Sequence, residues 1–387
     1  MNGPRQCGKT TLAKELVSTQ TAYRTLDDLS IRELAQNDPR QFVEHDFQTL
    51  VIDEIQRVPD LLSSIKMKVD EDTRPGQFLL TGSANIQTLP NVTESMAGRI
   101  RKLRLRPLTQ GEILQAKPTF LNKAFEMKLS NNLKNDFTRS NIMGFAMRGG
   151  FPEVFDLDSK QRKSWHRDYT DALLTRDLSD ITRINRQDSL RQLLDVLAAW
   201  SSKQMQISNI GSGLSITRPT VESYINALET LFLIERVKSW TKTDYDRVGK
   251  HPKIFMTDSG LMASTLGWRE EQVSLDPDRI GKLFETFIFN ELAAQIDASE
   301  DEYTLFHYRD REQREIDFLV ERDDGALLGI EIKSGSAVKR EHFKHLQWFK
   351  ENLAGKTPFI GIVLYSGNTS GSMGDGMWAI PIGSLWA

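Results

Sequence analysis

The sequence is poor in the residues that build disulfides and metal centres. Its 387 residues include a single cysteine, Cys7, and only six histidines. One cysteine cannot form a disulfide within a chain, and without a cluster of cysteine and histidine the sequence has no zinc site of the usual composition. A reducing cytoplasm is therefore the compartment that we expect for this protein.

Long apolar runs and an excess of one charge are also missing. No apolar run is long enough to span a bilayer and the start lacks a signal-peptide core, so we expect no membrane partner. The formal net charge of −3 excludes a surface that is basic all over, but it is compatible with a local basic face. Because 387 residues exceed one typical core, we expect a multidomain protein.

The chain does have a phosphate-binding pattern at its start. Residues Gly3–Thr10 fit the P-loop pattern G-x-x-x-x-G-K-T, in which the glycines allow a tight turn around phosphate oxygens. In such a loop the lysine reaches the β- and γ-phosphates, and the threonine hydroxyl binds Mg²⁺. We expect ATP to be bound by Gly3, Pro4, Arg5, Gln6, Cys7, Gly8, Lys9, Thr10 and Thr11. Lys9 also counts among the catalytic residues and Thr10 among the metal ligands.

The place of this loop in the chain is unusual. A P-loop normally follows a buried β-strand, but only Met1 and Asn2 precede this one. Two explanations are open from the sequence. Either the start was assigned too far downstream, or the site lacks its supporting strand and binds ATP poorly or not at all.

An acidic pair follows the next strongly apolar segment. Residues 47–56 contain three consecutive apolar positions and then Asp53 and Glu54, as expected for a buried parallel strand that ends in a Walker B pair. Asp53 would hold Mg²⁺ through water, and Glu54 would polarise the attacking water. Alone, such a pair is as often a solvated strand end, but the order and spacing of the motifs favour a nucleotide site.

A third strand is expected over residues 77–85. It ends in small and polar residues, at the sheet edge where ligands bind in open α/β sheets. The pattern resembles sensor 1 of the AAA+ ATPases. Ser83 or Asn85 is therefore the candidate contact to the γ-phosphate or to the attacking water.

A basic segment follows. Basic and apolar residues alternate over residues 100–106, which predicts an edge strand with one solvated face. Just before it, Arg99 could supply positive charge to the transferred phosphoryl group, in the same chain or from a neighbouring subunit of a homo-oligomer. The alternative is that the whole segment is a solvated basic strand.

Together these motifs resemble a known family. Gly3–Thr11, Ile52–Gln56, Leu80–Ser83 and Ala97–Arg99 are similar to the corresponding segments of a family of prokaryotic AAA+-type ATPases. The resemblance covers nearly the whole chain except the missing first strand. It implies an α/β multidomain fold in which a P-loop parallel-sheet ATPase is followed by a helical and winged-helix middle and a C-terminal restriction-endonuclease-like α/β domain of the PD-(D/E)XK type.

Domain boundaries follow from this resemblance. We expect the ATPase domain in residues 1–118, a helical linker in 119–200, a winged-helix-like domain in 201–265 and the nuclease-like domain in 266–387. Within the linker, Gly149 and Gly150 predict a turn. Arg176 and Asp177 match a recurrent motif of the family, and we interpret them as an interdomain salt bridge.

The middle region has the pattern of a helix-turn-helix. A short helix at residues 207–211 precedes a second helix that Thr217 opens with Pro219 in its first turn, and residues 231–237 would form a wing strand. In that arrangement double-stranded DNA would be contacted by Thr217, Arg218, Thr220 and Ser223. The alternative is a winged helix that only connects domains.

The C-terminal region contains an ordered set of polar residues. Glu285 lies at the edge of an amphipathic helix over 281–292, and two strands joined by a turn carry Asp317 and the pair Glu331 and Lys333. Because side chains alternate along a strand, Glu331 and Lys333 share one face.

These residues predict a nuclease-like site. Glu285, Asp317 and Glu331 would bind Mg²⁺ or Mn²⁺ through oxygen, and Lys333 would orient water and stabilise the developing phosphorane charge. Gln347, on the following helix, is a weaker candidate for substrate contact. The alternative is a domain that keeps the fold but does not cleave.

Two functions remain compatible with the sequence. The first is a Mg²⁺-dependent ATPase that couples its nucleotide state to a DNA-facing, nuclease-like domain. The second is a nucleotide-gated switch in which that domain is a docking surface without catalysis. A switch would hydrolyse ATP slowly and leave DNA intact in the presence of metal, and it would be unaffected by replacement of Lys333.

Overall fold

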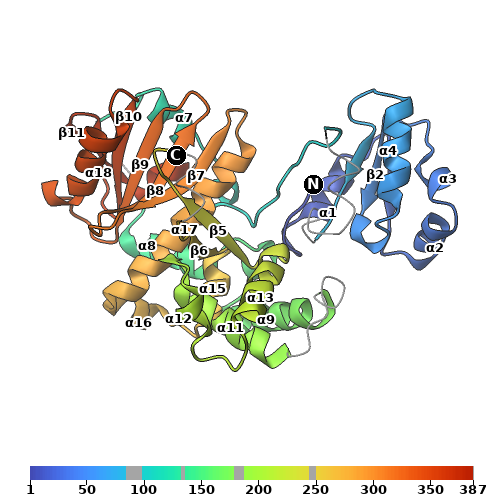
Figure 1. Cartoon of the computed structure of the whole chain (residues 1–387), viewed down its shortest axis with the longest axis horizontal. Coiled ribbons are helices and arrows are strands. Elements are labelled where there is room, and N and C mark those ends of the chain that lie inside the picture. The colour runs from blue at the N-terminus through green and yellow to red at the C-terminus, as the bar shows by residue number, and fades with distance from the viewer. Residues whose placement is uncertain (84–97, 132–135, 178–186, 244–249, 387) are drawn as a thin grey trace. The chain divides into compact units, whose positions relative to one another are not determined.

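A computed structural model describes residues 1–83, 98–131, 136–177, 187–243 and 250–386 (Figure 1). The chain divides into two compact units. The first contains Met1–Pro107, Arg176–Ile184 and Asn226–Leu233, and the second contains Leu108–Thr175, Asn185–Ile225 and Ile234–Ala387. No helix among the described residues has the length and apolar character needed to cross a bilayer.

The first unit contains a parallel sheet, as predicted. Its strands are β1 (Thr21–Thr25), β2 (Thr49–Asp53) and β3 (Phe78–Leu80), hydrogen-bonded in that order. The helices described among its first 107 residues are α1 (Lys9–Glu15), α2 (Leu29–Asn37), α3 (Pro39–Val43), the 3₁₀ turn η1 (Ile55–Arg57) and α4 (Leu61–Glu71). The apolar positions of β2 are fully buried in the core, as expected for a parallel strand covered on both faces.

The two residues before the P-loop extend this sheet. Asn2 forms bridges with Gly82 and with Arg104, both parallel, and its backbone exchanges hydrogen bonds with Leu103 and Leu105. The edge strand predicted over residues 100–106 is limited to this single bridge at Arg104. The alternating pattern was therefore a poor guide there, because only one residue of the segment finds a partner strand among the described residues.

The second unit contains a nine-stranded sheet with the order β11-β12-β10-β9-β8-β7-β5-β6-β4. Its strands are β4 (Lys203–Gln204), β5 (Ile234–Ser239), β6 (Lys253–Met256), β7 (Tyr303–Arg309), β8 (Glu315–Arg322), β9 (Leu327–Lys333), β10 (Phe359–Tyr365), β11 (Gly371–Gly374) and β12 (Met377–Pro381). The β8–β9 hairpin is antiparallel, and β9, β10 and β12 are parallel neighbours. The strand-turn-strand predicted for the nuclease-like region is therefore present.

One sheet joins two segments that the sequence assigned to different domains. β5 pairs with β7 in parallel at Lys238 and Ser239, opposite Phe306 and His307. β6 then lies between β5 and β4 and pairs antiparallel with both. The sheet thus runs across the predicted boundary at residue 265.

Figure 1 shows helices beside this sheet, and only some of them pack on it. The helices described after residue 107 are α6 (Gln110–Ile113), α7 (Phe120–Phe125), α8 (Arg139–Arg148), η3 (Pro152–Val154), α9 (Ser159–Ala172), η4 (Leu173–Asp177), α11 (Gln187–Trp200), α12 (Ile207–Gly211), α13 (Arg218–Thr230), α15 (Ser259–Thr265), α16 (Glu270–Leu275), α17 (Pro277–Ala298), η5 (Arg340–Phe343), α18 (Lys344–Phe349), η6 (Lys350–Ala354) and η7 (Ile382–Trp386). α17 packs on β6, β7 and β9, and α18 packs on β8, β9 and β10. The apolar stripe predicted for residues 283–292 is buried in the core, where Phe289 of α17 stacks on Phe255 and Phe318.

The predicted turn at Gly149 and Gly150 is a point of close backbone contact. Gly149 ends α8 with φ 78°, and the N–H of Gly150 donates to Asp258 Oδ2 at 2.7 Å. A Cβ on Gly150 would lie 2.2 Å from the carbonyl oxygen of Leu108. Because that obstacle is backbone, no side-chain rotation can relieve it.

We therefore expect Gly150→Ala to destabilise the second unit, by about 2–4 kcal/mol in the free energy of unfolding. Urea unfolding followed by tryptophan fluorescence measures this unit alone, because all seven tryptophans lie in it. Gly213→Ala is the matched control, since its Cβ would meet nothing within 4 Å. Equal unfolding midpoints for the two variants would contradict the expectation.

Glu291 of α17 is a buried carboxyl group with one described hydrogen-bond donor. The N–H of Gln110 donates to its Oε1 at 2.8 Å. Burial raises the pKa of Glu291 from about 4.5 to about 8, with Glu112 adding to the shift. The folded state therefore holds this proton more tightly than the unfolded chain, and the stability that the proton confers is lost as the pH rises from about 4.5 to about 8.

Glu291→Gln should remove this pH dependence. The free energy of unfolding of the variant should match that of the parent protein at about pH 5. Near pH 8.5 it should exceed the parent value by up to roughly 4 kcal/mol. Urea titrations at the two pH values, followed by tryptophan fluorescence, give the free energy of unfolding at each pH. Glu300→Gln, at an exposed position just after the same helix, should follow the parent at both. If Glu291→Gln were more stable than the parent by the same amount at both pH values, the raised pKa of Glu291 would not be the cause.

Candidate functional site

The P-loop has the backbone that its glycines predict. Gly8 is left-handed with φ 95°, and Gln6 also has a positive φ of 62°. Gly3 lies against another segment, because a Cβ there would be 2.0 Å from the carbonyl oxygen of Leu105. Only glycine permits this approach, so the first position of the motif is fixed by its neighbour as well as by the turn.

Lys9 lies on the inner side of the loop. Its ammonium is buried and donates to the carbonyl oxygens of Pro4 at 2.6 Å and Gly3 at 3.0 Å. Burial lowers the pKa of Lys9 below its ordinary value. Cys7 is also buried, and its Sγ donates to the Leu105 carbonyl at 3.6 Å, whereas Thr11 is exposed on α1. The P-loop thus holds the ammonium of Lys9 against its own carbonyl oxygens.

Asp53 is the centre of a hydrogen-bond cluster at the end of β2. The hydroxyl of Thr10 donates to its Oδ2 at 2.9 Å, and the phenol of Tyr23 donates to the same oxygen at 2.6 Å. Thr81 donates to the other oxygen, Oδ1. The two predicted Mg²⁺ ligands, Thr10 and Asp53, therefore lie together, and a hydroxyl beside a carboxylate is a donor set that suits Mg²⁺.

Tyr23 was missed from the sequence, although one signal was available. It lies on β1, whose Thr25 pairs with Asp53 in the parallel register. A tyrosine two residues before that position points to the same side of the sheet as Asp53. Burial and the nearby Asp53 raise the pKa of Tyr23, which keeps its hydroxyl a donor to the carboxylate.

Tyr23→Phe should therefore weaken binding of Mg²⁺ with nucleotide by about tenfold, because a group that hydrogen-bonds to a metal ligand orients that ligand. Titration of a fluorescent ATP analogue, with and without Mg²⁺, would measure this. Binding without Mg²⁺ should be unchanged. An equal loss in both conditions would indicate a general effect on the fold instead.

Glu54 and Ser83 also lie together. Glu54 has a left-handed backbone with φ 59°, and the hydroxyl of Ser83 donates to its Oε2 at 3.3 Å. Gln56 donates to the same carboxylate and, at 3.0 Å, to Ser83 Oγ. Gln56 was not singled out from the sequence. Asn85, the other candidate at this edge, lies outside the described residues.

Arg99 lies beside α4. Its guanidinium forms an ion pair with Asp70 in the last turns of that helix. A role for Arg99 in phosphoryl transfer, within one chain or between subunits, stays a prediction.

In the second unit, three carboxylates surround a lysine. The ammonium of Lys253 lies 2.6 Å from Glu285 Oε1, 2.8 Å from Glu315 Oε1 and 3.8 Å from Asp317 Oδ1. The Lys253 side chain is only 1% exposed. Burial alone would lower the pKa of Lys253, but the three carboxylates raise it, so the residue stays charged.

The remaining predicted residues are adjacent to this cluster. The N–H of Ile332 donates to Asp317 Oδ2 at 2.8 Å, so Asp317 lies beside β9 as expected. Lys333 donates to Glu331 Oε1 at 2.7 Å. The other oxygen of Glu331 is buried and has no hydrogen-bond partner in the described part of the chain. Burial raises the pKa of both Glu285 and Glu331 to about 8.

The metal site predicted from Glu285, Asp317 and Glu331 stays a prediction. Within the described ranges, no three His, Cys, Asp or Glu side chains converge in a way that could hold a metal ion. Lys253, which was missed from the sequence, lies against two of the predicted ligands, at 2.6 Å from Glu285 and 3.8 Å from Asp317. In this arrangement the carboxylates hold the ammonium group of Lys253.

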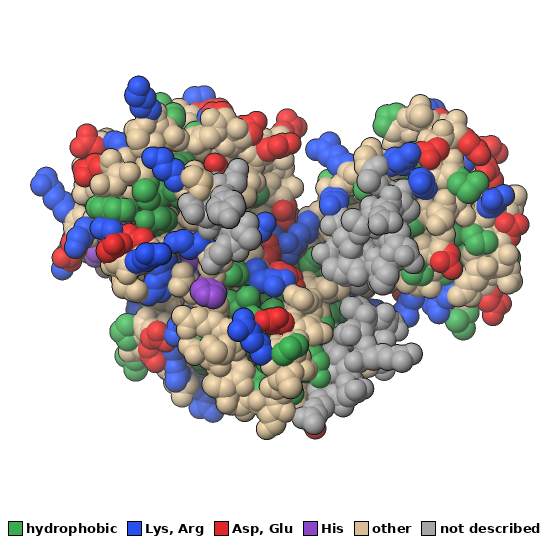
Figure 2. Space-filling view, in the orientation of Figure 1, with side chains coloured by type: hydrophobic (Ala, Val, Ile, Leu, Met, Phe, Trp, Pro, Cys, Tyr) green, Lys and Arg blue, Asp and Glu red, His purple; other side chains and the backbone are tan. Residues whose placement is uncertain are grey.

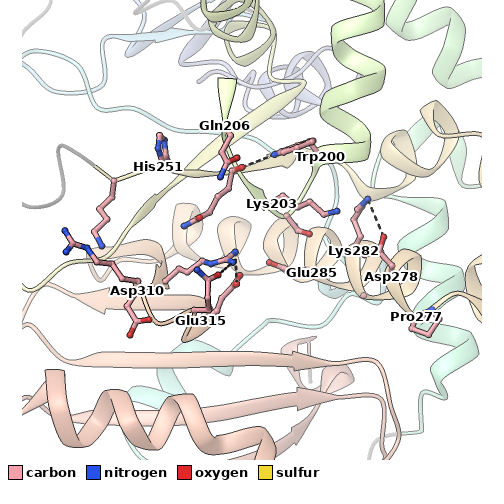
Figure 3. A pocket seen from close by; sticks show the side chains of 17 residues that line it. Trp200, Lys203, Gln206, His251, Pro277, Asp278, Lys282, Glu285, Asp310 and Glu315 are labelled. Carbon is pink, nitrogen blue, oxygen red and sulfur yellow. Dashed lines mark hydrogen bonds and ion pairs between the residues drawn. The ribbon is translucent and has the colours of Figure 1, made fainter. Parts of the chain in front are cut away.

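A pocket of about 700 Å³ opens beside this cluster (Figure 3). Glu285 and Glu315 contribute to its wall. Its basic side chains come from β4, α17 and the segments around β6 and β7, and they are Lys203, Lys250, His251, Lys282, Arg309 and Arg311. Lys203, Lys250 and Arg311 form no ion pair among the residues described, which leaves three cations available at one opening.

Elsewhere the two signs of charge are mixed. Figure 2 shows basic and acidic side chains interspersed on the visible face of each unit, in agreement with the small net charge. The helices predicted for the helix-turn-helix are present as α12 and α13, with Thr217, Arg218 and Ser223 exposed and Thr220 partly so. Arg218 pairs with Glu222 at 3.1 Å. A winged-helix role stays a prediction, and so does the Arg176–Asp177 bridge, whose side chains are outside the description.

Comparison with known proteins agrees with the site in the first unit. Residues 1–114 match the model of an AAA domain. Residues 140–272 and 280–385 match two families described as domains of unknown function, DUF8612 and DUF4143. The AAA match supports nucleotide binding by the first unit, and such domains usually take Mg²⁺ with the nucleotide.

Three relatives that resemble the chain over longer stretches are described as uncharacterized proteins. Uncharacterized proteins of Mycobacterium tuberculosis and Mycobacterium bovis are each 26% identical to this chain over 339 residues, which make up 87% of the chain and 70% of each relative. An uncharacterized protein of Haemophilus influenzae is 22% identical over 225 residues, 56% of the chain and 52% of the relative. A solved structure from Vibrio cholerae covers 90% of the chain and 89% of its own, at 9% identity and a TM-score of 0.19, which is too low to indicate a common fold.

Proposed function

We propose that this protein hydrolyses ATP in a Mg²⁺-dependent reaction at the P-loop of its first unit. One observation carries the proposal: the Thr10 hydroxyl donates to Asp53 at 2.9 Å, next to the buried ammonium of Lys9. These are the groups that a nucleotide with its metal requires, and they come from two segments far apart in the sequence. The AAA match over the same residues supports it.

Each residue has a definite task in this proposal. Lys9 exchanges its bonds to the Gly3 and Pro4 carbonyls for bonds to the β- and γ-phosphates. Thr10 and Asp53 hold Mg²⁺, which neutralises phosphate charge when bound. Glu54 orients the attacking water and accepts its proton, while Ser83 and Gln56 fix the position of the Glu54 carboxylate.

Replacement of Glu54 separates binding from hydrolysis. Glu54→Gln should bind ATP with unchanged affinity but hydrolyse it about 10²-fold or more slowly, since only the proton acceptor is lost. Release of phosphate and binding of a fluorescent ATP analogue, each with Mg²⁺ and with EDTA, test this. Glu15→Gln, at an exposed position at the end of α1, is the control. Normal hydrolysis by Glu54→Gln would contradict the proposal.

A second part of the proposal concerns the partner of the second unit. We propose that its basic pocket binds the phosphate backbone of double-stranded DNA, and that nucleotide bound to the first unit changes this affinity. The support is the group of three cations without an ion pair at one opening, in a chain whose net charge is slightly negative. Phosphate contacts of this kind give affinity without sequence preference.

The test is DNA binding as a function of salt. The triple variant Lys203→Ala, Lys250→Ala, Arg311→Ala should bind a fluorescent duplex more weakly, and the slope of log affinity against log salt should fall by about two to three. The control is Lys123→Ala, Lys160→Ala, Lys356→Ala, which removes the same charge at exposed positions outside the pocket. Equal binding by the two triple variants would exclude the pocket.

The alternative function is a nucleotide-gated switch whose second unit docks partners without cleaving them. Lys253 favours it, because this side chain engages two of the three carboxylates predicted for a nuclease metal site, Glu285 and Asp317. Duplex DNA incubated with the protein and Mg²⁺ or Mn²⁺ should then remain intact, with ATP or without it. Cleavage that Lys333→Ala abolishes would restore the nuclease hypothesis.

A further inference from the structure

The ammonium of Lys253 is a cation that lies among a set of carboxylates, and it is part of the protein rather than a bound ion. We infer that Lys253 serves as the resident cation of the second unit and excludes divalent metal ions from the cluster formed by Glu285, Glu315, Asp317 and Glu331. The inference depends on this cluster alone. It holds whether or not the first unit hydrolyses ATP.

The position of Lys253 is fixed from both sides. The residue opens β6, where its backbone is paired with Gln204 of β4 and with Val237 of β5. Its side chain is 1% exposed, and its ammonium lies within 2.8 Å of one oxygen each of Glu285 and Glu315. Pairing on both edges fixes the backbone of Lys253, and burial together with the two carboxylate contacts holds its ammonium among the acids.

A metal ion and this ammonium would compete for the same oxygens. Mg²⁺ binds oxygen at about 2.0–2.1 Å, so an ion on Glu285 and Asp317 would lie within a few ångströms of the Lys253 ammonium. Two cations at that distance repel strongly in a buried site. The ammonium also uses the oxygens of Glu285 and Glu315 that would replace the water around the ion.

The cluster nevertheless has unused capacity for a cation. Glu331 Oε2 is buried next to Asp317 and accepts no hydrogen bond from the described residues. A buried carboxylate oxygen without a donor is costly, and a cation would relieve that cost. If the Lys253 ammonium is removed while its volume is kept, the oxygens of Glu285, Asp317 and Glu331 become ligands for a divalent ion.

The experiment is binding of Mn²⁺ alone, measured from the electron paramagnetic resonance signal of the free ion in the absence of nucleotide. The full-length protein should bind equally with or without Glu331→Gln, since any weak binding at the P-loop is common to both. Lys253→Met should take up one further Mn²⁺ ion per chain. Lys253→Met combined with Glu331→Gln should lose that ion.

Stability supplies a second readout. The thermal midpoint of Lys253→Met, followed by tryptophan fluorescence, should rise with Mn²⁺, while that of the parent should not. If Lys253→Met does not fold alone, addition of Mn²⁺ should restore the folded tryptophan signal.

Three results would overturn the inference. The first is that Glu331→Gln lowers Mn²⁺ uptake by the parent protein, since the cluster would then bind metal beside the ammonium. The second is that folded Lys253→Met takes up no further Mn²⁺. The third is that Mn²⁺ fails to restore an unfolded Lys253→Met.

Discussion

Replacement of Lys9 by alanine should reduce ATP hydrolysis by roughly 100-fold or more, because each lost contact to transition-state charge costs about 10²–10³ in rate. The ammonium is buried within the loop and lies at 2.6–3.0 Å from two of its carbonyls. Those carbonyls would lose their donor, and the phosphates would lose their nearest cation. Binding of a fluorescent ATP analogue should fall as well.

Lys102→Ala is the control for this prediction. Lys102 is an exposed lysine of the same unit, in the basic segment that follows Arg99, so its loss removes the same charge at a site without a task in hydrolysis. The comparison also tests whether that basic segment contributes to nucleotide binding. If Lys9→Ala kept the parent rate while Lys102→Ala lost it, the assignment of the P-loop lysine would be wrong.

Replacement of Lys253 by methionine should destabilise the second unit by about 3–5 kcal/mol, as expected when one partner of a buried ion pair is removed. Three carboxylates would be left without their shared cation. The loss should be largest at alkaline pH, because only bound protons can then replace the ammonium. Burial already raises the pKa of Glu285 and Glu331 in the parent protein, and loss of the Lys253 charge raises it further, so the stability of the variant falls as the pH rises.

Urea unfolding in metal-free buffer, read by tryptophan fluorescence, measures this loss in the second unit. Lys203→Met, an exposed lysine on the neighbouring strand β4, should change the free energy of unfolding by no more than about 0.5 kcal/mol. A small effect of Lys253→Met at all pH values would mean that the carboxylates do not depend on its charge.

The sequence predicted those parts of the two sites that depend only on residues within a short segment. The P-loop, the acidic pair after β2 and the β8–β9 hairpin each lie within a short segment, where residue type and spacing directly reflect backbone needs. The sequence could predict that Thr10 and Asp53 lie together, because both motifs have fixed places relative to a parallel sheet.

The residues that were missed act across long separations. Tyr23 contacts Asp53 only because β1 lies beside β2, and β1 has no motif of its own. Lys253 precedes three apolar residues and looks like the solvated start of a strand, but its partner Glu285 is 32 positions away. Conversely, the alternating pattern of residues 100–106 predicted a strand, and only Arg104 forms a bridge. Pairing depends on which strand is adjacent, and a local pattern does not contain that information.

The continuous sheet of the second unit limits how the protein can be divided. If the chain were cut at residue 266, the strand β7 would lose β5 and present an open backbone edge to other molecules. The same cut would separate Lys253 from Glu285, Glu315 and Asp317, leaving an uncompensated group of acids in the shorter piece. The two segments are thus interdependent in charge as well as in hydrogen bonding, and they form one structural unit.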